Sequence, residues 1–178
     1  MPEISQKSVS IRLLTPQDAP DYCALRLRAL MDHPEAFTSS AEEEADRPLS
    51  WSETRLRADA SKPHDLFLGA ILDDELVGMV GLQGRYRPKE RHNATVVGMF
   101  VAPEAGGRGV GLALMHDLLA RARALPGLTQ LDLTVTEGND TAQRLYARCG
   151  FKVFGVLPRA IRVGGRYYAK VHMVLALR

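Results

Sequence analysis

The fold is decided by one stretch, Ala94-Thr95-Val96-Val97-Gly98-Met99-Phe100-Val101, which is followed by Pro103 and by the loop Gly106-Gly107-Arg108-Gly109-Val110-Gly111. The apolar run predicts a buried strand, and the proline predicts its end. After the loop, apolar residues recur at helical spacing: Leu114, Met115, Leu118, Leu119 and Ala122. A helix N-terminus offers unpaired N–H groups that favour an anion, and glycines let the backbone come close to it. We therefore expect a phosphate-bearing ligand at residues 106–111.

The rest of the chain alternates between strand and helix patterns. The predicted strands cover residues 9–13, 65–72, 76–82, 128–135, 151–157 and 167–177, and a short apolar run at 160–163 precedes the Gly164-Gly165 turn. The predicted helices cover residues 16–33, 51–60 and 139–148, besides the one after the glycine loop. This order predicts an α/β fold, with a mixed central β-sheet of about seven strands and helices on both faces.

Capping residues mark two of these helix starts. Thr15 followed by Pro16 is typical of an N-cap and a first helical position. Ser50-Trp51-Ser52-Glu53 fits the S-x-x-E capping box. The polar, acidic segment 35–49 between these two helices receives no predicted element.

Length and composition limit the class of protein. With 178 residues, 46% apolar and 25% charged, the chain predicts one globular domain over residues 9–178, preceded by a flexible N-terminus at residues 1–8. A net charge of +2 does not predict a nucleic-acid partner. No apolar run approaches the ~20 residues of a membrane span, so no membrane partner is predicted. Cys23 and Cys149 form no disulfide framework, and we expect a cytoplasmic protein without a metal site.

Two familiar phosphate-binding motifs do not fit the glycine loop. A P-loop needs a lysine and a hydroxyl residue after its last glycine, whereas Gly111 is followed by Leu112 and Ala113. A dinucleotide fingerprint needs a third glycine where Leu112 stands, and Asp132 lies in the middle of its strand instead of at the end. Nucleotide hydrolysis is excluded, and dinucleotide binding is disfavoured.

Two segments in order along the chain are informative together. The first runs from Val101 through Pro103 and the glycine loop to Leu114; the second is Val135-Thr136-Glu137-Gly138-Asn139-Asp140-Thr141-Ala142-Gln143-Arg144-Leu145-Tyr146-Ala147-Arg148-Cys149-Gly150-Phe151. The first resembles the central acyl-CoA motif of the GNAT superfamily of N-acetyltransferases. The second is similar to that superfamily's V-x-x-x-N-x-x-A-x-x-L-Y-x-x-x-G-F signature. The resemblance covers roughly residues 65–177, and its two motifs fall on the expected elements.

The resemblance implies that acetyl-CoA, the acyl-donor substrate, lies between two splayed parallel strands at residues 96–101 and 131–135. The amides that would hold its pyrophosphate belong to Gly106, Gly107, Arg108, Gly109, Val110 and Gly111. Main-chain groups at Phe100 and Val101 would pair with the pantetheine arm and polarise the acetyl carbonyl. Asn139 would contact the cofactor, as would Tyr146, which would also protonate the departing thiolate. Taken alone, Tyr146 is more typical of a core tyrosine, although the surrounding motif favours the catalytic role, and Asn139 is equally natural as a helix N-cap.

The chain departs from the family pattern at two places. Gly106 stands where the family usually has Gln or Arg, and Arg108 is a substitute contact for phosphate. The strand at 94–101 also lacks the acid that many members use as general base. His92 just upstream is our candidate for that base, and Glu137, Asp132 and a water-mediated route are alternatives.

The implied function is acetyl transfer from acetyl-CoA to a primary amine by direct attack in a ternary complex. The alternative is a non-catalytic acyl-CoA-binding sensor or regulatory module. The acceptor is a small molecule, a protein N-terminus or a lysine, and we expect its site to involve the first two helices and the loops at 84–92 and 159–168. The last strands also offer a surface for a possible homodimer.

Overall fold

The computed structural model describes residues 9–178, and the predicted flexible N-terminus at residues 1–8 lies outside this part of the chain. The strands are β1 (Ser10–Leu13), β2 (Leu66–Leu72), β3 (Glu75–Gly84), β4 (Asn93–Val101), β5 (Gln130–Thr136), β6 (Lys152–Val163) and β7 (Arg166–Ala176). The α-helices are α1 (Ala19–Asp32), α2 (Ala41–Ala45), α3 (Leu49–Leu56), α4 (Val110–Ala124) and α5 (Asp140–Arg148), and short 3-10 turns cover Pro16–Asp18 and Pro103–Ala105.

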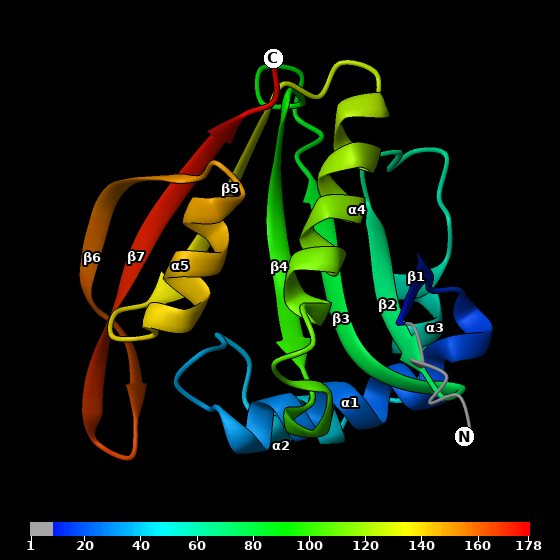
Figure 1. Cartoon of the computed structure of the whole chain (residues 1–178), viewed down its shortest axis with the longest axis vertical. Coiled ribbons are helices and arrows are strands. Elements are labelled where there is room, and N and C mark those ends of the chain that lie inside the picture. Colours follow the sequence, from blue (N-terminus) through cyan, green and yellow to red (C-terminus); the bar gives the residue numbers. More distant parts are fainter. Residues whose placement is uncertain (1–8) are drawn as a thin grey trace, which may run out of the picture.

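All seven strands join one mixed sheet in the order β1-β2-β3-β4-β5-β7-β6 (Figure 1). The pair β4–β5 is parallel, and the other neighbouring pairs are antiparallel. Helix α4 crosses one face, where a Cβ on Gly78 of β3 would lie 3.1 Å from Leu114. Helix α1 packs on the opposite face, where Tyr22 meets the ring of Phe67 edge-on at 5.7 Å. The predicted fold class is confirmed.

Strands β4 and β5 run side by side only at their N-terminal ends. Their register covers three pairs, which begin at Asn93 and end at Thr95 opposite Asp132. A polar clamp holds this last pair, because Thr95 Oγ1 donates to Asp132 Oδ1 at 2.6 Å and Arg85 forms an ion pair with the same carboxylate. Beyond the clamp the two strands diverge, and Figure 1 shows β5 and β7 leaning away from β4.

Two predicted helix starts need correction. Ser50 is not an N-cap: α3 begins at Leu49 after Pro48, and it ends at Leu56 instead of Ala60. The S-x-x-E box operates one segment earlier, where Ser40 Oγ accepts from Glu43 N at 3.1 Å and Ser40 N donates to Glu43 Oε2 at 2.8 Å. This box begins α2, in the segment that carried no predicted element. Thr15 precedes a 3-10 turn, and the α-helix itself begins at Ala19.

The C-terminal hairpin is longer than predicted. The runs at 151–157 and 160–163 belong to a single strand, β6, whose pairing with β7 shifts register between Leu157 and Ile161. Arg159, inside that shift, adopts a positive φ of 53°. Strand β6 forms one edge of the sheet. No helix within residues 9–178 is long and apolar enough to cross a membrane.

Candidate active site

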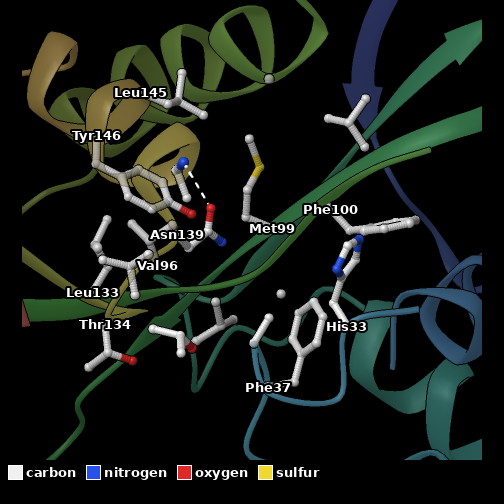
Figure 2. A pocket seen from close by; sticks show the side chains of 18 of the residues that line it. His33, Phe37, Val96, Met99, Phe100, Leu133, Thr134, Asn139, Leu145 and Tyr146 are labelled. Carbon is white, nitrogen blue, oxygen red and sulfur yellow. Dashed lines mark hydrogen bonds between the residues drawn. The ribbon is translucent and has the colours of Figure 1, made fainter. Parts of the chain in front are cut away.

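A cleft of about 1280 Å³ opens where β4 and β5 diverge. Residues 96–101 of β4 and 133–136 of β5 form its two walls, and the glycine loop, α5 and the connection after α1 complete it. The volume exceeds the ~300–1,000 Å³ typical of small-molecule sites and suits an extended ligand. Figure 2 shows apolar walls with a few polar side chains directed inward.

The glycine loop leads directly into α4. Gly107 and Gly109 have positive φ values of 71° and 74°, a conformation that favours glycine. The first intrahelical bond runs from Ala113 N to Gly109 O at 3.0 Å, so the preceding N–H groups have no partner within the helix. Five of the six predicted loop residues line the cleft, namely Gly106, Gly107, Gly109, Val110 and Gly111. Arg108 is exposed and does not line it.

Gly111 allows α4 to lie close to both neighbouring elements. A Cβ at this position would sit 3.3 Å from Met99 Cε of β4 and 3.3 Å from Leu145 Cδ2 of α5. The loop amides and the cleft wall are therefore held close together. This arrangement is suited to an anionic group next to an apolar channel.

Strand β4 contains a bulge at the centre of the cleft. Gly98 has φ 62°, and the pairing with β3 shifts between Met79 and Gly81. The edge of β4 that faces β5 has no strand partner after Thr95, so main-chain groups of this wall are available to a ligand. Phe100 and Val101 both line the cleft, as predicted from the sequence.

Tyr146 and Asn139 reach the cleft from α5. Asn139 caps the helix, because its Oδ1 accepts from Ala142 N at 3.2 Å, and it also lines the cleft. The Tyr146 ring packs edge-on against Phe151 at 6.2 Å, and its hydroxyl points toward the space that Asn139 faces (Figure 2). Burial raises the pKa of Tyr146, with a smaller contribution from Cys149, so the phenol stays protonated and can act as a donor.

His92 does not reach this cleft. Its side chain is exposed at the N-terminal end of β4, where Nε2 lies 3.1 Å from Asn93 Nδ2. Its carbonyl accepts from the N–H groups of Thr129 and Gln130. The predicted base role of His92 has no geometric support here, and neither Glu137 nor Asp132 lines the cleft.

Sequence reasoning missed His33 as a residue of the site. It follows α1, lines the cleft and has its ring 6.2 Å from that of Phe100 (Figure 2). The carboxylate of Glu35 lies 3.9 Å from its Nδ1. No local pattern marks His33, because Phe100 is far away in the sequence.

Lys170 is the second missed residue, on β7. Its Nζ donates to Thr136 Oγ1 and to the carbonyl of Ala36, each at 2.8 Å. Burial lowers the pKa of Lys170 from 10.5 to about 8, although Glu35 opposes the shift. No local pattern in the sequence indicates that Lys170 contacts Thr136 and Ala36.

Cationic side chains outnumber acidic ones in the lining. The six Arg and Lys residues are Arg26, Arg47, Arg55, Arg144, Arg148 and Lys170. Among the residues that the structure describes, Glu44 is the one acid in the lining. Arg144 and Arg148 come from α5. Arg26 comes from α1, Arg47 from the segment before α3, and Arg55 from α3. The cleft as a whole favours anionic ligands.

Comparison with known proteins agrees with the ligand class that the cleft favours. A profile of the acetyltransferase (GNAT) family matches residues 27–151. The chain therefore belongs to this family. The recognition from the two motifs is confirmed, and so is the prediction of an acyltransferase enzyme.

The relatives extend over nearly the whole chain. The chain is 29% identical to a phosphinothricin N-acetyltransferase of Alcaligenes faecalis over 96% of its length and 84% of that protein's. It is 28% identical to an L-methionine sulfoximine/L-methionine sulfone acetyltransferase of Pseudomonas aeruginosa, over 96% and 95%. The structure of a phosphinothricin acetyltransferase from Sinorhizobium meliloti in complex with acetyl-CoA superposes with a TM-score of 0.78 at 19% identity, over 94% and 88%. At this identity, the similarity to the S. meliloti structure shows a shared fold.

Proposed function

We propose that this protein transfers the acetyl group of acetyl-CoA to a primary amine by direct attack in a ternary complex. One observation carries the proposal: a glycine loop at a helix N-terminus and an unpaired β4 edge line the same cleft as a buried tyrosine. The acetyl-CoA complex of the S. meliloti structure supports the choice of acyl donor.

In this proposal, the amides at residues 106–111 bind the pyrophosphate of CoA, and the pantetheine arm pairs with the β4 edge. Main-chain N–H groups near Phe100 and Val101 polarise the acetyl carbonyl as negative charge develops on it. Asn139 contacts the cofactor where β5 ends. Arg144 and Arg148 add positive charge on the side of the cleft that α5 contributes.

Two side chains are proposed to move protons. Tyr146 donates its phenolic proton to the departing CoA thiolate, a role supported by its burial and by the direction of its hydroxyl. His33 accepts the proton of the amine, supported by its place beside Phe100 and by the neighbouring carboxylate of Glu35. We prefer His33 to His92 because His92 does not line the cleft.

Direct transfer is favoured over an acyl-enzyme because no cysteine is placed as a nucleophile. Within the described part of the chain, neither Cys23 nor Cys149 lines the cleft. Burial also raises the pKa of the Cys149 thiol, which lowers its thiolate fraction. The amine is therefore the group that attacks the acetyl carbonyl.

Two measurements test the function. CoA should raise the melting temperature, whereas NAD and ATP should not. Thiol release from acetyl-CoA should depend on an added primary amine, with intersecting initial-rate lines when both substrates are varied. Parallel lines would contradict the ternary complex. Tight CoA binding without turnover on any amine would instead support a sensor module.

We also propose a homodimer through β6 and a cytoplasmic location. Strand β6 is a sheet edge with exposed apolar side chains at Val153, Phe154, Val156 and Leu157. An apolar, unpaired edge can pair with an identical edge around a two-fold axis. Sedimentation should give a dimer mass that Val156→Asp reduces to the monomer mass; a monomeric wild type would contradict the interface. Both cysteines are free, which suits a reducing compartment.

A further inference from the structure

Three arginines gather at the end of the cleft that α1 and α3 form. Arg26 comes from α1, Arg55 from α3 and Arg47 from the segment before α3, and all three line the cleft. The carboxylate of Glu44 lies 3.6 Å from Arg26 Nη2 and 3.4 Å from Arg47 Nη1. Arg26 and Arg47 thus share one carboxylate, no described acid pairs with Arg55, and the cluster keeps an excess of positive charge.

Aromatic rings hold these guanidinium groups in place. Trp51 lies between Arg47 and Arg55, whose Cζ atoms are 4.0 and 5.1 Å from its ring centroid. Arg55 Nε also donates to the Tyr22 hydroxyl at 3.1 Å. Stacked and hydrogen-bonded arginines lose little freedom when they bind a ligand, so the cluster is preorganised.

Arg26 combines a largely buried side chain with an unpaired nitrogen atom. Its side chain is 12% exposed, and its Nη1 atom is buried without a hydrogen-bond partner among the described residues. Burial lowers the pKa of Arg26, and the positive charge of Arg55 lowers it further. Tyr22 and Glu44 act in the opposite direction and raise it, but the net shift is downward. A buried guanidinium nitrogen without a partner is costly unless an anion approaches it.

The cluster is also related to the proposed reaction centre. Arg26 lies on α1, and His33 is the residue that follows the last turn of this helix; both line the same cleft. Phe37, whose ring centroid is 4.9 Å from Arg26 Cζ, points into the cleft between the two walls (Figure 2). A ligand that reaches from His33 past Phe37 meets Arg26 and the rest of the cluster.

We infer that Arg26, Arg47 and Arg55 form an anion subsite for the acceptor, which is a small primary amine that also carries a carboxylate or another oxyanion. Guanidinium groups match such oxyanions in geometry and charge. The inference rests on the proposed acetyl transfer and adds the chemical class of its acceptor. An amine without the anionic group leaves the positive charge of the cluster uncompensated, so it binds weakly.

The test compares matched amines and matched variants. The probes are L-glutamate, L-glutamine, isoglutamine and glutamic acid diamide, with thiol release from acetyl-CoA as the readout. The wild type should prefer at least one anionic probe over the neutral diamide by roughly 10- to 100-fold in kcat/KM. Arg47→Gln should remove most of that preference by raising KM for the anionic probe.

Arg47 suits this test because its side chain is 34% exposed, so its loss should not unfold the chain. The control is Arg57→Gln, an exposed arginine at the end of α3 that does not line the cleft and should keep the preference. Equal activity on the diamide and the anionic probes would overturn the anion subsite and leave acetyl transfer standing. Absence of turnover on all probes and on other primary amines would overturn both.

Discussion

Lys170 Nζ donates a hydrogen bond to the carbonyl of Ala36 at 2.8 Å, and this bond ties β7 to the connection that follows α1. The same connection is held by a second bond, from Thr136 Oγ1 to the carbonyl of Glu35 at 2.7 Å. His33 and Phe37 belong to this connection, so its anchoring determines how these two residues line the cleft. The acceptor side of the cleft is thus positioned by a buried lysine.

The buried lysine predicts a pH-dependent stability. Below about pH 8 Lys170 is charged in both the folded and unfolded chain, and the cost of burying that charge is fully present. Between about pH 8 and 10.5 the folded chain has released the proton and the unfolded chain still holds it, so stability rises with pH. Across this whole pH range, the contribution of Lys170 to the free energy of unfolding rises by about 3 kcal/mol.

Urea unfolding at pH 7.5 and pH 10 measures this effect against Lys170→Met, which lacks the titrating group. The difference in unfolding free energy between variant and wild type should change by about 2 kcal/mol in favour of the wild type at the higher pH. A difference that stays constant with pH would show that the lysine is not perturbed by burial.

Tyr146→Phe removes the proposed acid and keeps the ring. We expect kcat/KM at neutral pH to fall at least roughly tenfold, because a positioned general acid contributes about 10²–10⁴-fold. The melting temperature should change little, since no described residue supplies a hydrogen bond to the hydroxyl. CoA should still stabilise the variant. An unchanged kcat/KM would remove Tyr146 from the proton pathway.

The two histidines form a matched pair for the base. His33→Ala should lower kcat/KM at least roughly tenfold, whereas His92→Ala should change it less than about tenfold. Both side chains are exposed, so neither change should unfold the chain. The measurement is kcat/KM for the amine at saturating acetyl-CoA. A larger loss for His92→Ala would restore the original assignment of the base.

Gly109→Ala tests the glycine loop. The position has φ 74°, and an added Cβ would meet no atom within 4 Å, so the substitution acts through backbone strain and not through a clash. Strain of about 1–2 kcal/mol should move the loop amides and weaken CoA binding about tenfold by calorimetry. Gly127→Ala is the control, because Gly127 has φ 76° and open space but does not line the cleft. Equal CoA affinity in both variants would argue against the pyrophosphate site.

The sequence predicted most of the fold because strong local signals mark it. The glycine loop and the Asn139–Phe151 segment combine periodicity with fixed spacing, and both lie where expected. Weak local signals failed. Ser40 and Ser50 both begin an S-x-x-E pattern, but only Ser40 precedes a helix and caps it. Because α3 begins at Leu49, directly after Pro48, Ser50 already lies in the first turn of that helix.

The acceptor side of the site was beyond prediction for a different reason. Arg26, His33 and Arg55 approach the cleft only because α1 packs against the sheet and α3 packs against α1, and no spacing along the chain records that packing. His92, by contrast, lies next to the decisive strand in sequence, but its side chain is not part of the cleft lining. Contacts between distant segments determine which charged groups share the cleft.

A crystal structure with CoA and an anionic amine is the most direct test of the account. We predict the pyrophosphate on the amides of residues 106–111, the thiol on the side of the Tyr146 hydroxyl, and the acceptor's anionic group on Arg26 and Arg47. Density for CoA outside the cleft between β4 and β5 would contradict the proposed function. CoA in the cleft with the acceptor's anion away from these arginines would contradict the anion subsite alone.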